Sequence, residues 1–320
     1  MQYNRIRDPL RFARSNSSVA FAAERGFDAE AQLIAMEIEG IDIAVLFPTL
    51  GLSFVEKSGL DRNLAHAISR AYNDWLYEFC RHSPDQLKMA AMLPMQDVNL
   101  ACQELLRCVN DYGAVGAFVH PRYMNGHYWH SKYWDPLYGL LEQLNIPICF
   151  HGGAGMTTTP FDRFGENRAL RQVATNPIEM QLTVLALVLG GIFEFYPKLR
   201  AGFLEAQSWW VPGLLERMEL ILHEYKEADA PFLSLTPQEY WLRNCFSGIE
   251  GSERSLGAIT DLIGANNLVV STDFPHHDSH FPEVANLLLE NPSLSRDQAG
   301  QILMGGGRLY GFTDNDFARA

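Results

Sequence analysis

Three histidines and two aspartates crowd the stretch LVVSTDFPHHDSHFPE, residues 268–283. The apolar residues 268–270 predict a buried strand, and Asp273 is the first carboxylate after it. A carboxylate next to imidazoles can bind a metal ion or move protons near neutral pH. We therefore expect Asp273 to be both a metal ligand and a catalytic group, His276 to transfer protons, and His277 to contact a substrate.

Further side chains of this kind end other apolar runs. His151 ends PICFH and precedes two glycines, which leave room for a ligand or a sharp turn. Glu205 ends AGFLE, and a carboxylate there needs a metal, an arginine or water as its partner. His120 ends GAFVH, close to Arg122. We predict that His151, Glu205 and His120 bind a metal with Asp273 and that Arg122 binds substrate. A salt bridge or helix cap for Glu205, and a hydrogen bond to a backbone carbonyl for His120, remain open.

Seven short runs of apolar residues predict the strands that position these side chains. Most are apolar throughout, as strands covered on both faces require. They lie at 43–48, 87–94, 115–120, 146–151, 199–205, 244–249 and 268–273. Helical patterns fill most of the gaps, at 61–80, 97–109, 134–144, 178–195, 213–226, 252–264 and 295–304. Asp61 and Asp97 are expected to cap the first two of these helices.

Strands that alternate with helices predict a parallel sheet with right-handed crossovers. An open doubly wound sheet and a closed barrel both fit, but no Gly-x-Gly-x-x-Gly follows an early strand. A barrel would also gather the polar residues at the strand ends, among them Glu250, around one mouth. We therefore predict a single (β/α)8 TIM-like barrel over residues 1–320, with residues 1–30 as an irregular lead segment.

This barrel lacks one predicted strand, since only seven are found, so its first strand is absent or degenerate. Either VAFAA at 19–23 completes the ring, or the first strand lies ahead of Met1.

Composition narrows the classes of partner. With 25 Lys and Arg against 38 Asp and Glu, the formal charge of −13 argues against nucleic acid and anionic membranes as partners. The most apolar segment, residues 182–193, is too short to span a bilayer, and the first 20 residues lack the apolar stretch of a signal peptide. Five scattered cysteines favour reduced thiols, and so a cytoplasmic protein, over disulfides or a structural zinc site.

Other motifs are less informative. HGGAG, residues 151–155, is similar to the oxyanion loop of esterases, but no Gly-x-Ser-x-Gly accompanies it. Trp209 is expected to wall the mouth and contact an apolar part of the substrate. Asp278 and His280 are expected to cap the helix that follows them.

STDFPHHDS resembles the sequence around the last metal-binding aspartate of the amidohydrolase-related family (amidohydrolase 2). That family includes relatives of aminocarboxymuconate-semialdehyde decarboxylase and many metal-dependent hydrolases. Four further stretches look like the family's second to sixth strand regions in the same order, so that the resemblance covers about residues 35–312. They read GIDIAVLFPTLGL, PMQDVNLACQELLRCVNDYGAVGAFVHP, WDPLYGLLEQLNIPICFHGG and LEAQSWWVPGLLERME.

The resemblance implies a metal-bearing (β/α)8 barrel in which His151 matches the fifth-strand histidine ligand and Asp273 the eighth-strand aspartate. Two positions depart from the family. Glu205 stands where decarboxylases carry a sixth-strand histidine, and nothing in residues 1–40 matches the Asp/His-x-His motif of the first strand. No histidine precedes His66. Either that strand lies upstream, or this member has lost it and binds metal poorly.

These features predict a metal-dependent hydrolase or non-oxidative decarboxylase that acts on a small organic acid, amide or ester. The expected cofactor is a divalent metal, zinc before manganese or iron. A dinuclear iron monooxygenase and a metal-poor, non-catalytic partner subunit are the alternatives. The resemblance also implies a homo-oligomer, or a hetero-oligomer with a homologue.

Overall fold

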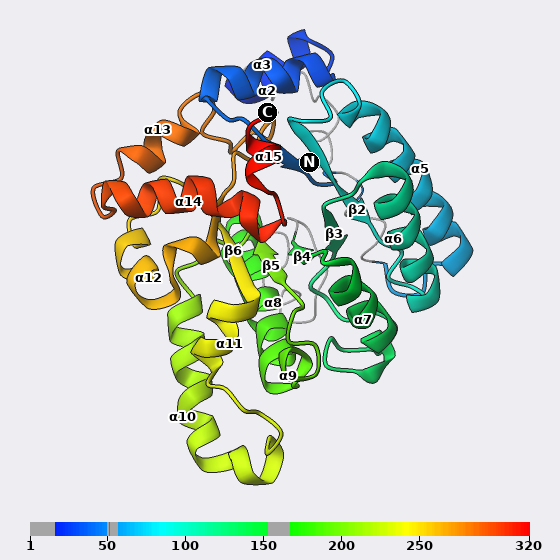
Figure 1. The fold of residues 1–320 in the computed structure, drawn as a ribbon, viewed down its shortest axis with the longest axis vertical. Coiled ribbons are helices and arrows are strands. Elements are labelled where there is room, and N and C mark those ends of the chain that lie inside the picture. The colour runs from blue at the N-terminus through cyan, green and yellow to red at the C-terminus, as the bar shows by residue number, and fades with distance from the viewer. Residues whose placement is uncertain (1–16, 50, 52–56, 153–166) are drawn as a thin grey trace.

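In the described part of the chain, seven parallel strands form one sheet, in which each strand pairs with the next from β1 to β7 (Figure 1). The computed structural model describes residues 17–49, 51, 57–152 and 167–320. The strands are β1 (Ala44–Leu46), β2 (Leu87–Met92), β3 (Gly116–Val119), β4 (Ile148–His151), β5 (Ala201–Leu204), β6 (Cys245–Ile249) and β7 (Leu268–Val270). All seven lie inside the ranges predicted from sequence, which confirms the parallel α/β architecture of a TIM-like barrel wall.

Helices surround this sheet (Figure 1). They are α2 (Ser17–Glu24), α3 (Ala29–Glu39), α5 (Arg62–Cys80), α6 (Val98–Tyr112), α7 (Asp135–Leu144), α8 (Arg168–Leu189), α9 (Ile192–Phe195), α10 (Val211–Asp229), α11 (Pro237–Asn244), α12 (Leu256–Ile263), α13 (Val284–Leu289), α14 (Arg296–Leu309) and α15 (Asp314–Phe317), with short 3-10 turns at Lys132–Trp134 and Ala265–Asn267. The far end of α10 projects furthest from the sheet. No helix in the described part of the chain has both the length and the apolar character needed to cross a bilayer.

The predicted helix caps are confirmed. The side chain of Asp61 accepts hydrogen bonds from the backbone N–H groups of Asn63 and Leu64, at 3.0 and 2.9 Å. Asp97 does the same for Asn99 and Leu100 at the start of α6. Each cap satisfies N–H groups that have no partner inside the helix, which fixes where the helix begins.

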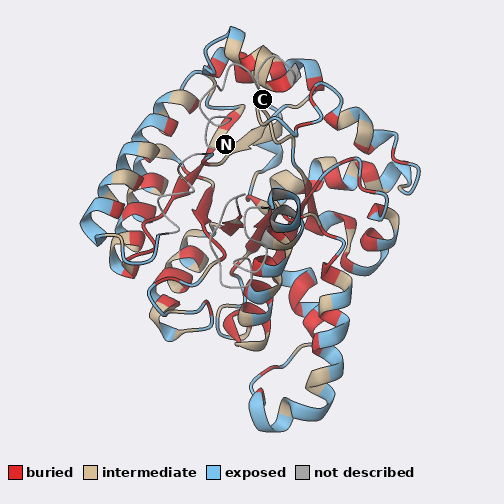
Figure 2. Cartoon of the chain, turned by 180° about the vertical axis from the view of Figure 1, so that it is seen from behind, coloured by how far each residue is buried: buried red, intermediate tan, exposed pale blue. Residues whose placement is uncertain are grey.

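Alternate residues of each strand face opposite sides of the sheet; in β2 to β6 both sides are buried, whereas β1 is only partly buried (Figure 2). On the helix-covered side, Phe150 stacks on Phe203 at a ring-centroid distance of 5.6 Å. A second cluster contains Cys149, Leu204 and Phe246, the opposite positions of β4, β5 and β6. His151 therefore lies on the side of Cys149, at the carboxyl end of β4.

The N-terminal segment differs from the prediction. VAFAA lies within α2, so it does not supply a strand, and α3 begins at Ala29 inside the segment predicted to be irregular. Residues 1–16 lie outside the described residues. Helix α2 contacts the loop after β7 through Phe21, whose ring centroid is 5.1 Å from that of Phe281. Glu39 at the end of α3 accepts the backbone N–H groups of Val284 and Ala285, each at 3.1 Å. The two helices thus pack against the loop after β7 and the start of α13.

The close packing at Gly202 gives a first prediction. A Cβ added at Gly202 would overlap the buried ring of Phe246. We expect Gly202→Ala to lower the free energy of unfolding by about 1–3 kcal/mol, because the ring cannot move without disturbing the cluster. Gly213 in α10 is the matched control, since nothing lies within 4 Å of an added Cβ there. Gly213→Ala should raise stability by about 0.5–1 kcal/mol. Equal effects of the two substitutions in urea unfolding would contradict this packing.

Buried Glu253 gives a second prediction, on pH. Its Oε1 accepts the backbone N–H of Glu250 at 2.8 Å, and burial raises its pKa to about 7. A raised carboxyl pKa means that the folded chain holds the proton more tightly than the unfolded chain. The resulting stability is complete at low pH and is lost as the pH rises through about 7.

Glu253→Gln should therefore become relatively more stable than the original chain as the pH rises from 5 to 8, by up to about 3 kcal/mol. Urea unfolding at pH 5, 6, 7 and 8 measures this difference. Glu290→Gln, at an exposed position, should give a flat difference. A flat difference for Glu253→Gln as well would rule out the proposed linkage.

Candidate metal centre

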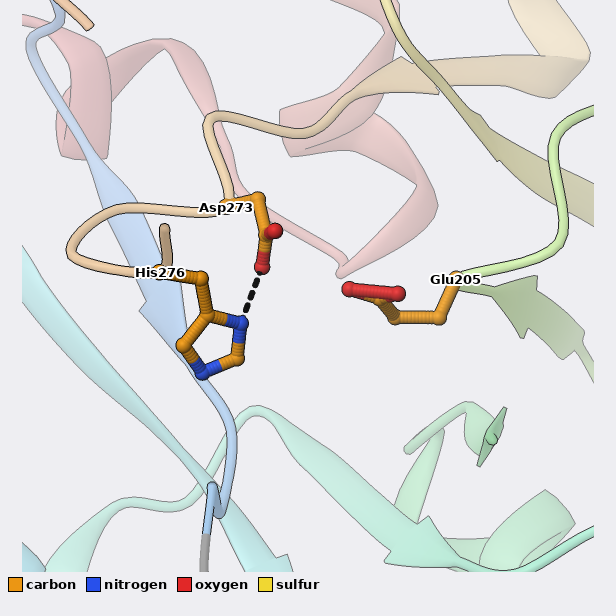
Figure 3. Close-up of side chains that lie close together, drawn as sticks. All are labelled: Glu205, Asp273 and His276. Carbon is orange, nitrogen blue, oxygen red and sulfur yellow. Dashed lines mark ion pairs between the residues drawn. The ribbon is translucent and has the colours of Figure 1, made fainter. Parts of the chain in front are cut away.

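The strand ends bring Glu205, Asp273 and His276 together (Figure 3). Glu205 follows β5 directly, Asp273 lies three residues beyond β7, and His276 is in the turn after it. One ligand atom from each of these three side chains lies within 4.8 Å of the other two. We call this group the rim cluster. Asp273 and Glu205 are 68 residues apart in the chain, yet they meet because carboxyl ends of parallel strands share one edge.

Both carboxylates stand on unusual backbone. Glu205 has φ of 62° and Asp273 has φ of 50°, in the left-handed region that side chains other than glycine rarely adopt. Such residues cost roughly 1–3 kcal/mol each and persist only where the surrounding fold holds them. Here Asn176 of α8 donates from Nδ2 to the backbone oxygen of Glu205 at 2.7 Å. The turn that aims Glu205 at Asp273 is therefore fixed from a neighbouring helix.

The charges in the rim cluster are not balanced. Burial, followed by the nearby charge of Asp273 and a hydrogen bond to it, raises the pKa of Glu205 to about 8. His276 Nδ1 lies 2.5 Å from Asp273 Oδ1, and this hydrogen bond raises the pKa of His276. Two carboxylates this close repel each other when both are ionised. A divalent cation between them would replace the proton that Glu205 otherwise keeps, so the donor set fits a metal ion.

His151 is prepared for ligation as well. Its Nδ1 lies 2.7 Å from the carbonyl oxygen of Gly152, which can only accept, so Nδ1 carries the hydrogen and Nε2 keeps its lone pair. Burial lowers the pKa of His151 to about 4, while the charge of Asp273 opposes this shift. The imidazole is thus neutral at pH 7. His151 stacks against Phe47 at 5.7 Å between ring centroids, but it is not one of the three residues of the rim cluster.

His120 makes a different hydrogen bond. Its Nδ1 accepts the backbone N–H of Arg122 at 3.1 Å, and the side chain is buried at the end of β3. Because Nδ1 accepts this hydrogen bond, the hydrogen of the neutral ring is on Nε2. A protonated Nε2 has no lone pair for a metal ion, which opposes ligation through that nitrogen. Metal binding by His120 stays a prediction.

A cavity of about 330 Å³ opens beside the rim cluster. Its walls include Glu205, Asp273 and the predicted substrate contact Trp209. Arg122 and His277 are not among the described lining residues. The side chain of His277 is instead 60% exposed and lies 3.4 Å from Asp278.

The sequence prediction was wrong for Asp278 and His280. Both line the cavity, and the first N–H groups of α13 are accepted by Glu39 instead. Glu250, which directly follows β6, also lines the cavity, and burial raises its pKa. The sequence indicated Glu250 as a candidate, because it directly follows a predicted strand, as Glu205 does after β5. No pattern in the sequence marked Asn176.

Comparison with known proteins gives the family. The family described as amidohydrolase matches residues 23–312. Gamma-resorcylate decarboxylase of Rhizobium radiobacter is 28% identical over 256 residues, which are 77% of this chain and 76% of the relative. The 2-amino-3-carboxymuconate-6-semialdehyde decarboxylase of Dictyostelium discoideum is 22% identical over 246 residues, 76% of this chain and 65% of the relative.

A solved structure agrees in fold. The dihydroxybenzoic acid decarboxylase of Polaromonas sp. JS666, with bound manganese and the inhibitor 2-nitroresorcinol, superimposes with a TM-score of 0.74. It is 22% identical, and the match covers 87% of this chain and 84% of that one. The decarboxylase relatives and the family match confirm the prediction of an enzyme from the metal-dependent hydrolase and decarboxylase group. The chain belongs to the amidohydrolase family.

Proposed function

We propose that this chain is a metal-dependent, non-oxidative decarboxylase of small aromatic carboxylic acids. The observation that carries the proposal is the rim cluster, in which two carboxylates and an imidazole face one another beside a cavity. The named relatives act on aromatic acids or on a carboxylated muconate semialdehyde, which favours decarboxylation over amide or ester hydrolysis.

The proposed metal ligands are Glu205, Asp273 and His151. Two carboxylates with one imidazole suit manganese as well as zinc. The manganese in the Polaromonas relative favours manganese here. A bound metal would supply Lewis-acid polarisation of the substrate carboxylate.

The chain's own residues would then handle the proton. Loss of CO2 leaves the electron pair of the broken C–C bond on the ring carbon, which must take up one proton. His276 is suited to deliver it, because Asp273 holds its Nδ1 and raises its pKa. The nitrogen left to deliver a proton is Nε2, which lies 3.2 Å from Thr49 Oγ1.

The cavity fits a substrate of this size. A volume of about 330 Å³ accommodates a single ring with its carboxylate. Val173 and Trp209 offer apolar surface to the ring. The carboxylate would face Glu205 and Asp273, whose charge a bound metal would neutralise.

Metal binding tests the ligand set. We expect about one manganese or zinc ion per chain, and affinity losses on the order of 100-fold for Glu205→Gln and His151→Ala. His276→Asn, which removes only a hydrogen-bond partner of a ligand, should lose about tenfold. His223→Ala, at an exposed position of α10, is the control and should bind like the original chain. Titration calorimetry and elemental analysis measure this, and unchanged affinity in Glu205→Gln and His151→Ala would remove the proposed site.

Turnover tests the reaction. We expect metal-loaded protein to release CO2 from at least one mono- or dihydroxybenzoate, and chelation to abolish the release. At saturating metal, His276→Asn should lower kcat by about 100-fold or more, because it removes the proton donor. Carbon dioxide detection and product chromatography measure this. Hydrolysis of amides or esters without CO2 release would reassign the chain to the hydrolases.

A further inference from the structure

The cavity has a second polar region, separate from the rim cluster. Glu250 Oε2 lies 3.7 Å from His280 Nε2, and His280 Nε2 lies 3.3 Å from Ser252 Oγ. The side chain of Gln207 is hydrogen-bonded to Glu250. Glu250, Gln207 and His280 all line the cavity. Glu250 thus has His280 and Gln207 as polar neighbours.

The strand order places this region next to the proposed metal ligands. β6 lies between β5 and β7, and Glu250 follows β6 just as Glu205 follows β5. Glu250 is nevertheless outside the rim cluster. A ring whose carboxylate lies between Glu205 and Asp273 therefore has Glu250 within the same cavity.

A carboxylate at this position would discriminate between substrates by their charge and by their hydrogen-bonding groups. Ionised Glu250 only accepts hydrogen bonds, so it favours a ring substituent that donates one. Hydrogen bonds to charged groups are stronger than neutral ones. A second carboxylate on the ring would meet Glu250 and Asp278, which both line the cavity and would repel it.

We infer that Glu250 is a specificity-determining residue that accepts a hydrogen bond from a hydroxyl or amino substituent of the substrate ring. The inference rests on the proposed function and deepens it. Among aromatic acids, those that carry a donor substituent would bind more tightly, and benzene dicarboxylates would bind more weakly.

Two substitutions separate this role from a general effect of charge. Glu250→Gln keeps the shape and the contact with Gln207 but removes the negative charge. The side chain is 47% exposed, so the exchange leaves the buried core intact. Glu283→Gln is the matched control, because Glu283, just before α13, is an exposed carboxylate that does not line the cavity.

Binding to the metal-loaded protein gives the test, without need of turnover. The probes are benzoate, 3-hydroxybenzoate, 4-hydroxybenzoate and benzene-1,3-dicarboxylate, each measured by titration calorimetry. We expect the better hydroxybenzoate to bind about tenfold more tightly than benzoate, and the dicarboxylate to bind more weakly than benzoate. In Glu250→Gln, the hydroxybenzoate should bind only about threefold more tightly than benzoate, or less. The difference in affinity between benzoate and the dicarboxylate should also become smaller. Glu283→Gln should change neither ratio.

The outcomes distinguish this inference from the proposed function. If the acids bind but the ratios are the same in Glu250→Gln, the role of Glu250 is refuted and the decarboxylase proposal stands. If no aromatic acid binds to the original metal-loaded chain, both fall. Metal content measured on each variant ensures that a change in the ratios does not come from loss of the ion.

Discussion

The carboxyl groups of Glu205 and Asp273 face each other in a partly buried site, and their mutual repulsion governs the chemistry around them. Without a cation, burial and then the nearby charge of Asp273 raise the pKa of Glu205 to about 8, so that Glu205 keeps its proton and the repulsion is relieved. A divalent ion relieves the repulsion in another way, by neutralising both groups at once. The space between the two carboxyl groups therefore favours positively charged ligands. The same negative charge raises the pKa of His276, whose Nδ1 is hydrogen-bonded to Asp273.

The barrel wall makes this juxtaposition possible. Every strand pairs in parallel with its sequence neighbour, so all seven carboxyl ends lie along one edge. The residues just beyond β5, β6 and β7 then enter one cavity. This arrangement requires unfavourable backbone conformations, because Glu205 and Asp273 both have positive φ. Apolar packing on both sides of the sheet and the bond from Asn176 hold these turns in place.

The N-terminal helices influence the same region from outside. Phe21 of α2 packs on the loop that contains His276, and Glu39 of α3 caps α13 directly after that loop. The loop from Asp273 to Val284 is thus held at both ends, by its own strand and by α2 and α3. This arrangement gives residues 17–39 a structural role next to the site, although they supply no residue of the rim cluster.

The sequence by itself determined the strands, most helices and the residues that end each strand, because these follow from short-range patterns of apolar and capping residues. Asp61 and Asp97 cap their helices as predicted, and His151, Glu205 and Asp273 were all identified as strand-end candidates. The family resemblance correctly added the amidohydrolase assignment.

Only the tertiary structure decided which of those side chains meet. The alanines of VAFAA favour a helix, but its place beside the loop after β7 depends on packing against Phe274 and Phe281. The hydrogen bond that occupies Nδ1 of His120 depends on the turn after β3. The places of Glu250, Asp278 and His280 in the cavity depend on strand order and on the path of a loop. Such features arise from contacts between distant residues, which a pattern along one chain does not encode.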